Sequence, residues 1–333
     1  MKILFISLFS FVIGLVSANT ISKFGFRLGL IDVPSERSAH DNPIPKAGGI
    51  GIPIAFGITA FLFYKLNLIL VSTAIILSIV ALFNDKIGIP ISFRLILEFT
   101  LGLIIVLVYK EELINLIHNN YGALVMLFMV AFLTIFIVAT TNFFNFMDGI
   151  NGIGGFEAII SFSFLGIFAL YFKRSPEILL IVFSVLASCA GFLLLNFPKA
   201  KVFMGDVGSI FIGFLFAGMV VFLTKSLKEF LLLASFQSVF YIDCISTIFL
   251  RLMKRENILK AHKNHLYQKL VHHSGWTHSK VVLYFGLAQV LIGIFSLILF
   301  RLNIVFLIIF WLSLLTAYWT ILISSKLIRY EET

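Results

Sequence analysis

Three short polar segments interrupt a chain that otherwise has few acidic residues. They read ALFND at 81–85, NFMDGING at 145–152 and FMGDVGS at 203–209, and each lies at the end of a long apolar run. Their aspartates are Asp85, Asp148 and Asp206, in a chain with only 16 Asp and Glu residues. Because a charge is costly to bury, an ionisable residue in or beside a membrane is a functional-site hypothesis by default. Three such residues near glycines indicate a site for a metal ion and phosphates.

The composition excludes a soluble globular domain, because 60% of the residues are hydrophobic and only 12% are charged. The apolar runs have the length of membrane spans, roughly 17–25 residues. They lie at about 2–18, 48–64, 67–83, 94–109, 121–140, 153–172, 178–195, 209–224, 230–249, 281–299 and 302–324. Helices satisfy their own backbone hydrogen bonds in lipid. We therefore expect an all-α polytopic membrane protein of about eleven helices, forming one domain over 1–333.

The basic residues predict the orientation of these helices. With the N-terminus on the periplasmic side, most Lys and Arg residues fall in the inner loops, as the positive-inside rule requires. All three acidic segments then face the cytoplasm. The net charge of +9 is explained by this topology and by attraction to anionic membrane lipids, so we expect no nucleic-acid partner. The first helix also has the pattern of a signal peptide, and the orientation does not depend on which reading holds.

The first inner loop, 31–51, combines three prolines, which favour an extended path, with a glycine-rich start to the second helix. The N–H groups of Gly48, Gly49 and Gly51 could meet an anion there. The cationic side chains beside them are Arg37, His40 and Lys46. The alternative is an ordinary basic juxtamembrane loop.

The next two polar segments differ in the strength of their signal. Asn84 and Asp85 end the third apolar run, where an aspartate often only caps a helix or pairs with a neighbour such as Lys86. Asn145, Asp148 and Asn151 recur every three residues, so one helical turn would place them on roughly one face. Close helix packing explains the glycines around them, but it does not explain the polar side chains.

The segment 196–209 places Asp206 between two glycines just before a new helix. A carboxylate there could hold a hard cation, and an oxygen-rich site with few carboxylates suits Mg²⁺. Phe203 could stack on a planar base or anchor the chain at the membrane interface.

Farther along, His262 and His265 could share a helical face and contact phosphate; zinc is disfavoured because no Cys or acid accompanies them. Asp243, inside an apolar run, needs a polar partner, and Arg251 reaches it only through a neighbour.

Together these segments resemble the polyprenyl-phosphate N-acetylhexosamine-1-phosphate transferase family of bacterial membranes. The resemblance extends from Asp32 to about Gln268. Its motifs are DVPSERSAH at 32–40 with PKAGG at 45–49, ND at 84–85, NFMDGING at 145–152 and NFPKAKVFMGDVGS at 196–209. In the loop HKNHLYQ, Tyr267 and Gln268 are similar to O-antigen initiators that use deoxy-N-acetylhexosamine donors. The family implies eleven helices in the bacterial inner membrane, and we also expect that the protein can form a homodimer.

The resemblance implies transfer of N-acetylhexosamine 1-phosphate from a UDP-sugar to undecaprenyl phosphate, with release of UMP. This step starts a lipid-linked surface glycan such as O-antigen lipopolysaccharide or another cell-wall polysaccharide. It implies that Asp206 binds Mg²⁺, with Mn²⁺ as a substitute, that Asp148 and Asn145 line the nucleotide pocket, and that Asn196 and Phe203 lie near the uridine. We therefore expect catalytic roles for Asn84, Asp85 and Asp148, and substrate binding by Arg37, His40, Lys46, Asn145, Asn151, Asn196, Phe203, His262 and His265.

The residue chemistry agrees with this function. Attack of one phosphate on another needs charge neutralisation and alignment more than covalent help from the protein. A metal ion with Lys, Arg and His contacts supplies such stabilisation. Two positions depart from the family pattern, because Asn84 and Asn151 stand where Asp is usual. Asn84 cannot act as a base, although a lipid phosphate with a second pKa near ~6 is already largely ionised at neutral pH.

Two other classes of protein fit some of these features. A multi-span transporter also has many helices and intramembrane acids, but its site usually lies near the bilayer midplane between repeated halves. The acids here cluster at one predicted face, and no repeat is visible. An intramembrane aspartyl protease using Asp148 and Asp206 would need both acids within spans. The sequence therefore favours the transferase and leaves the donor sugar open between N-acetylglucosamine and deoxy sugars such as N-acetylfucosamine or N-acetylquinovosamine.

Overall fold

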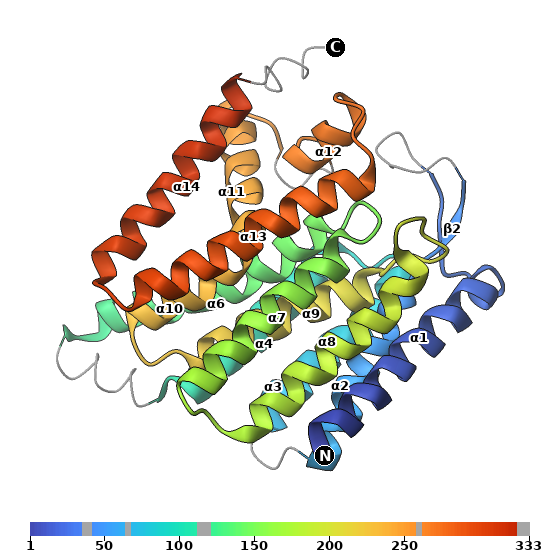
Figure 1. Cartoon of the computed structure of the whole chain (residues 1–333), viewed down its shortest axis with the longest axis horizontal. Helices are drawn as coiled ribbons and strands as arrows, with labels where there is room; N and C mark the ends of the chain where they lie inside the picture. The colour runs from blue at the N-terminus through green and yellow to red at the C-terminus, as the bar shows by residue number, and fades with distance from the viewer. Residues whose placement is uncertain (35–41, 64–67, 112–120, 258–261, 325–333) are drawn as a thin grey trace.

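The computed structural model shows a bundle of helices with one short hairpin (Figure 1). It describes residues 1–34, 42–63, 68–111, 121–257 and 262–324. The elements are α1 (Lys2–Leu28), β1 (Ile31–Asp32), β2 (Ile44–Pro45), η1 (Gly48–Ile50), α2 (Gly51–Phe63), α3 (Leu68–Ile87), α4 (Ile91–Tyr109), α6 (Ala123–Met147), α7 (Ile153–Tyr171), α8 (Pro176–Asn196), α9 (Asp206–Leu223), α10 (Leu227–Ala234), η2 (Ser235–Gln237), α11 (Ser238–Met253), α12 (Leu266–His272), α13 (His278–Phe300) and α14 (Ile304–Ser324).

The predicted all-α membrane architecture is confirmed. In the described part of the chain, ten helices are long and apolar enough to cross a membrane, and Gly48–Phe63 forms a shorter apolar helix. In Figure 1, α1 begins at the opposite end of the bundle from the hairpin, α12 and the end of α14. We call the end that carries the hairpin and α12 the polar end. Its location on the cytoplasmic side remains a prediction from the basic residues.

Several helices extend farther than their apolar runs predict. The first run was expected to end at residue 18, but α1 continues to Leu28 and ends at Gly29, which adopts the left-handed conformation typical of a helix C-terminus (φ 73°). Likewise α3 reaches Ile87, α4 begins at Ile91 and α6 reaches Met147. The turns added to α3 and α6 contain Asn and Asp residues, so a hydropathy criterion cuts them off. They carry the side chains of the candidate site.

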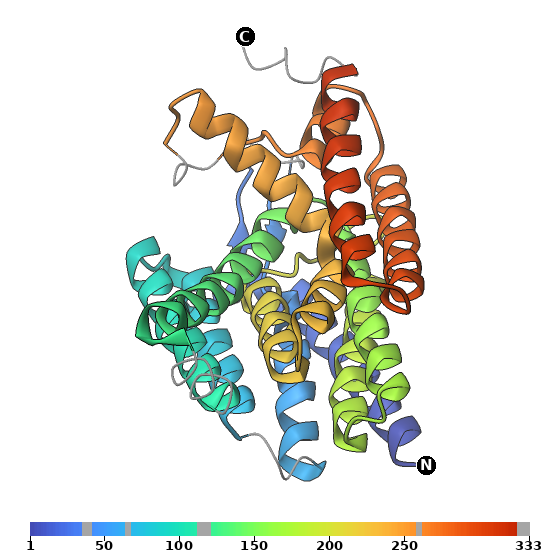
Figure 2. The same ribbon diagram turned by 90° about the vertical axis from the view of Figure 1, so that its left-hand side faces the viewer.

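Helix α9 occupies the middle of the bundle, where α6 and α3 are its main neighbours and α2, α4 and α7 also contact it (Figures 1 and 2). Every residue from Val207 to Val221 is buried. A helix that is apolar on all sides is stable only inside such a bundle. The start of α9, at Asp206, is therefore fixed by packing along its whole length.

The span formed by α10, η2 and α11 is broken by the 3-10 turn η2. Its released backbone groups are satisfied by Gln289 of α13, which donates to the Ser235 carbonyl oxygen (2.9 Å) and accepts from the Val239 N–H (3.1 Å). Irregular backbone at membrane depth is tolerated where protein supplies such partners. The break sets the path of α11 toward the polar end.

Helices α1 and α8 pack closely because glycines face each backbone. A Cβ built on Gly14 would lie 2.1 Å from the Ser188 carbonyl oxygen, and one on Gly191 would lie 2.2 Å from the Phe11 carbonyl oxygen. Small residues permit this approach between membrane helices. The first helix is thus packed as a structural member of the bundle.

We predict that Gly191→Ala destabilises the protein by roughly 1–3 kcal/mol, because a methyl group has no room against the α1 backbone. Gly102→Ala in α4 is the control, since its Cβ would lie 3.4 Å from Ile137 Cγ2, an ordinary contact. Thermal unfolding of the purified proteins in detergent measures the difference. Equal midpoints for the two variants would contradict the described α1–α8 contact.

Candidate active site

Asp85, in the last turn of α3 at the polar end, caps the start of α9. Its buried carboxylate accepts hydrogen bonds from the backbone N–H groups of Asp206 (3.1 Å) and Val207 (3.0 Å). The first N–H groups of a helix have no partner within the helix, and the helix dipole favours a negative charge there. Asp85 therefore joins two helices that are more than 100 residues apart in the sequence and fixes the position of Asp206.

The Asp206 carboxylate is surrounded by donors from three other helices. It accepts hydrogen bonds from Asn84 Nδ2 of α3 (2.6 Å), Asn145 Nδ2 of α6 (2.9 Å) and Arg94 Nη1 of α4 (3.0 Å). Its side chain is 24% exposed, so the group is partly accessible. The structure thus brings together three predicted site residues, Asn84, Asn145 and Asp206.

The Arg94 guanidinium group also contacts two buried side chains, Glu98 and Asn142, which the sequence analysis did not select. Arg94 Nη2 donates to Asn142 Oδ1 (3.2 Å), Arg94 Nε lies 3.4 Å from Glu98 Oε1, and Asn142 donates to the other Glu98 oxygen. An Arg and a Glu four residues apart in an apolar run form a signal that could have found them. The guanidinium group offsets the charges of both Asp206 and Glu98.

The basic partner of Asp85 differs from the one suggested by the sequence. Lys86 is exposed. The Nζ atom of Lys46, which directly follows β2, lies 3.9 Å from Asp85 Oδ1. Neighbours in a helix point in different directions, so the residue next to Asp85 cannot follow it into the bundle. Lys46 brings a positive charge from the hairpin to the polar end of α3.

The glycines that open the second helix do not offer their N–H groups to an anion. Gly48 donates to the Phe203 carbonyl oxygen (2.8 Å) and Gly49 to that of Met204 (3.0 Å), while Phe203 N–H donates to Pro45 (2.8 Å). The predicted anion contact is therefore wrong for Gly48 and Gly49. A Cβ on Gly48 would lie 2.5 Å from Val202, so these glycines allow two loops to pair. This pairing places Lys46 beside the start of α9.

The expected helical face formed by Asn145, Asp148 and Asn151 is also wrong. Helix α6 ends at Met147, and the chain turns before Gly152. The φ of Gly152 is 86°, a left-handed conformation that favours glycine. Asn145 alone reaches Asp206, whereas Asn151 Nδ2 donates to the Pro198 carbonyl oxygen (3.1 Å). The regular spacing could not reveal that α6 ends at Met147, within the motif.

Asp148 lies in this turn, outside the membrane-spanning helices, and accepts a hydrogen bond from Gly154 N–H. Desolvation raises its pKa to about 8, the Gly154 bond lowers the pKa, and the nearby Asp206 and Asp85 carboxylates raise it. The neutral form of Asp148 is thus favoured near neutral pH. A cation beside the group would favour its charged form.

The remaining predicted residues occupy different settings. Asn196 is buried; it accepts from Gly152 N–H (2.7 Å) and donates to the Val202 carbonyl oxygen (3.0 Å), so it ties two turns together. His262 and His265 precede α12, so they do not share a helical face, although their ring centroids lie 4.9 Å apart. Phe203 is half-buried in the segment paired with the hairpin. Arg37 and His40 lie outside the described residues.

The residues around Asp206 fit a hard divalent cation. Among the residues that the structure describes, no group of three or more His, Cys, Asp or Glu side chains forms a metal cage. The oxygen ligands offered are carboxylates, because Asp206 is partly accessible and Asp85 and Asp148 are near enough to act on it electrostatically. The Nδ2 groups of Asn84 and Asn145 hold Asp206 in place. Mg²⁺ binds through one or two carboxylates and keeps several waters, so it needs no such cage.

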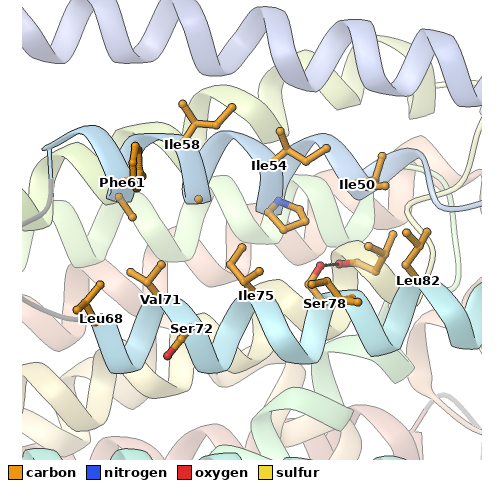
Figure 3. A pocket seen from close by; sticks show the side chains of 15 residues that line it. Ile50, Ile54, Ile58, Phe61, Leu68, Val71, Ser72, Ile75, Ser78 and Leu82 are labelled. Atoms are coloured by element: carbon orange, nitrogen blue, oxygen red, sulfur yellow. Dashed lines mark hydrogen bonds between the residues drawn. The ribbon is translucent and has the colours of Figure 1, made fainter.

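An apolar groove of about 850 Å³ runs between α2 and α3 (Figure 3). Ile58, Phe61, Leu68 and Ile75 line it, and its only polar lining side chains in the described chain are Ser72 and Ser78. At one end it reaches Val207, whose carbonyl oxygen accepts a hydrogen bond from Ser78 (3.3 Å). The groove therefore ends next to the residue that follows Asp206.

Residues 67–224 match the sequence model of the family described as Glycosyl transferase family 4. A protein of Bacillus subtilis named "Probable undecaprenyl-phosphate N-acetylglucosaminyl 1-phosphate transferase" is 26% identical over 90% of this chain and 84% of its own length. The undecaprenyl-phosphate alpha-N-acetylglucosaminyl 1-phosphate transferase of Escherichia coli K12 is 32% identical over 63% of this chain and 59% of its own length. A phospho-N-acetylmuramoyl-pentapeptide-transferase of Caldicellulosiruptor bescii is 25% identical over 78% and 84%.

We predict that Asp85→Ala is less stable than Asp85→Asn by roughly 1–3 kcal/mol, because alanine leaves two buried N–H groups at the start of α9 without an acceptor. Both variants remove the charge, so their difference isolates the hydrogen bonds. Lys86→Ala, at the exposed next residue, is the control and unfolds like the unmodified protein. Thermal unfolding measures all three; the same midpoint for the Ala and Asn variants would show that the cap is not needed.

Proposed function

We propose that the protein transfers an N-acetylhexosamine 1-phosphate from a UDP-sugar to undecaprenyl phosphate, because residues 67–224 match the sequence model of Glycosyl transferase family 4. The names of the relatives from Bacillus subtilis and Escherichia coli support this acceptor and favour N-acetylglucosamine as the sugar. The observation that carries the proposal is the meeting of Asp206, Asp85, Lys46 and Arg94 at the polar end of a membrane bundle. The product would start a lipid-linked surface glycan at the bacterial inner membrane.

In the proposed reaction, an oxygen of the lipid phosphate attacks the sugar-bearing phosphorus of the donor. The bond between that phosphorus and the bridging oxygen of the diphosphate breaks, and UMP leaves. Such a transfer depends on alignment and on neutralising negative charge. Lys46 and Arg94 bring positive charge to the site, and Asn145 orients Asp206. Asp206, with Asp148 nearby, would hold Mg²⁺, which when bound would offset the charge of the diphosphate.

The contacts of Asn84 support a reaction without a base at this position. Its Nδ2 donates to Asp206 and its Oδ1 accepts from the Ile89 N–H (2.6 Å), so both polar atoms of Asn84 have structural partners. A lipid phosphate with a second pKa near ~6 is already largely dianionic at neutral pH. Asn84 thus acts in our proposal by holding Asp206, and the acceptor phosphate attacks in its ionised form.

The groove between α2 and α3 supports a lipid acceptor. From Leu68 to Leu82 it follows α3 for about 21 Å at 1.5 Å per residue, most of a hydrocarbon core about 30 Å thick. Among the described residues its lining carries no charged side chain, and one of its ends adjoins Val207. We propose that the prenyl chain lies in this groove, because the attached phosphate would then be next to Asp206. A transporter has no comparable need for a lipid groove that ends at its polar site.

Tyr267 and Gln268, which resemble the branch that uses deoxy sugars, have structural contacts. Tyr267 is 0% exposed and donates to the Phe146 carbonyl oxygen (2.9 Å), and Gln268 accepts from the His265 N–H (3.3 Å). The assignment to that branch therefore rests on residues that shape the loop. A panel of UDP-sugars has to identify the donor.

We predict that Asp206→Asn lowers transfer by at least about 100-fold, since it removes the carboxylate proposed to hold the metal; losses of this size are typical for electrostatic catalytic groups. The assay follows UMP release from UDP-N-acetylglucosamine with undecaprenyl phosphate and Mg²⁺. Glu177→Gln, which changes an acid at the start of α8, is the control and keeps normal turnover. Near-normal turnover of Asp206→Asn at the same Mg²⁺ concentration would reject the metal assignment.

We predict that Asn84→Asp changes the rate little or slows it, because the new carboxylate would lose the donor bond to Asp206 and add charge near the anionic acceptor. The comparison is made from pH 5.5 to 8, across the range in which the lipid phosphate ionises (pKa near ~6). A tenfold gain, about 1.4 kcal/mol of barrier, would show that a base at residue 84 is needed.

We predict that Ile75→Trp, which fills the groove, raises the KM for undecaprenyl phosphate severalfold while a short, water-soluble prenyl phosphate is used as before. Ile76→Trp on the neighbouring lipid-exposed surface is the matched control. Equal effects of the two substitutions on the long acceptor would place the prenyl chain elsewhere.

A further inference from the structure

Asp243 is a buried acid of α11 that none of the roles described so far uses. Arg251, the basic residue considered from the sequence, instead donates to Glu256 (2.8 Å) and to the Asn257 carbonyl oxygen (2.6 Å). The partner of Asp243 is His265, whose Nδ1 lies 3.0 Å from Asp243 Oδ1. Both side chains are buried, and they join α11 to the segment before α12.

The same Asp243 oxygen holds more than the histidine ring. It also accepts hydrogen bonds from the Leu266 backbone N–H (3.1 Å) and from the Thr247 hydroxyl (3.2 Å). A buried carboxylate is stable only when such donors replace water. A side-chain hydrogen bond also links Asp243 to Tyr318 of α14. Because two of these donors belong to residues 265–266, the carboxylate fixes both the ring of His265 and the backbone at the start of α12.

The ring of Tyr267 connects His265 to the turn that carries Asp148. Its ring stacks with that of Tyr267 (centroids 5.8 Å apart, planes 19° apart). Tyr267 donates to the Phe146 carbonyl oxygen, and a Cβ on Gly149 would lie 2.1 Å from its hydroxyl oxygen. The segment that Asp243 fixes is thus pressed against the residues on both sides of Asp148.

His262 is the more accessible histidine of this segment. Its ring lies 4.9 Å from that of His265 and is half-buried, whereas His265 is 3% exposed. A ring that is closed off by Asp243 and Tyr267 is suited to support, and the half-buried ring beside it is suited to contact a phosphate. The two histidines therefore differ in accessibility: His265 is enclosed by protein, and His262 is partly accessible.

We propose that Asp243 is a positioning residue, which holds His265 and thereby sets His262 and the start of α12 against the Asp148 turn where the donor's phosphates bind. This inference rests on the proposed transferase function. It assigns the donor side of the site to the contact between α11 and α12, and it separates His265, a support, from His262, a substrate contact. Loss of Asp243 then weakens use of the UDP-sugar and leaves the lipid acceptor unaffected.

Steady-state kinetics of the purified full chain test this assignment. Asp243→Ala should lower kcat/KM for the UDP-sugar at least tenfold while the KM for undecaprenyl phosphate stays within twofold. Asp243→Asn keeps an oxygen acceptor for the Leu266 backbone N–H and the His265 ring Nδ1, so it should retain most of the kcat/KM of the unmodified protein. Thr247→Val removes the hydroxyl contacts with Asp243 and Tyr318 but keeps the link from Asp243 to His265, and it should stay within twofold of the unmodified protein.

A double substitution shows whether Asp243 acts through His265. Asp243→Ala with His265→Ala should be no slower than the slower single variant, because both changes break the same link. Independent effects that multiply in the double variant would overturn the proposal, as would an equal rise in the KM values for the donor and the acceptor.

Hydrogen exchange separates this inference from the proposed function. Amides of 262–268 should exchange at least tenfold faster in Asp243→Ala than in Thr247→Val, and unchanged exchange would overturn the positioning role. If the unmodified protein released no UMP from any UDP-sugar, the transferase proposal would fail on its own, while the exchange result would still decide whether Asp243 fixes this segment.

Discussion

The hydrogen bonds between Asp85 and the start of α9 are the contact on which the polar end depends. They place a buried carboxylate of α3 on two backbone N–H groups, so that Asp206 stands at a fixed point among four helices. Because α9 is buried along its length, the cap also couples the position of the site to the packing of the whole bundle. A shift of α9 would move Asp206 away from Asn145 and Arg94.

The site also balances charge in a way that suits phosphate chemistry. Lys46 and Arg94 lie beside Asp85 and Asp206, and Arg94 is braced by buried Glu98 and Asn142. Such pairs rarely contribute much net stability, because removing both charges from water is costly. Their value is functional in our account. A metal ion and an anionic substrate can exchange partners with groups that are already positioned, with little rearrangement of the helices.

The sequence predicted the helical membrane architecture and the three acidic segments, because long apolar runs and isolated acids are local signals. It failed where partners come from distant segments. Gly48 and Gly49 pair with 203–204, and Asp85 meets Lys46 in place of Lys86. The regular spacing of Asn145, Asp148 and Asn151 suggested a helix, but α6 ends at Met147 and α7 starts only after Gly152. Arg94 and Glu98 carry a local signal, an acid and a base four residues apart in an apolar run, but their contact with Asp206 appears only when α4 packs beside α9.

Divalent cation binding tests the central claim most directly, namely that the capped start of α9 presents Asp206 as the metal carboxylate. Electron paramagnetic resonance of the purified protein with Mn²⁺ and a UDP-sugar measures bound and free metal without requiring turnover. We predict one bound Mn²⁺ per chain, with affinity lost in Asp206→Asn and kept in Glu177→Gln, the acid at the start of α8. Undiminished Mn²⁺ binding by Asp206→Asn would contradict the account.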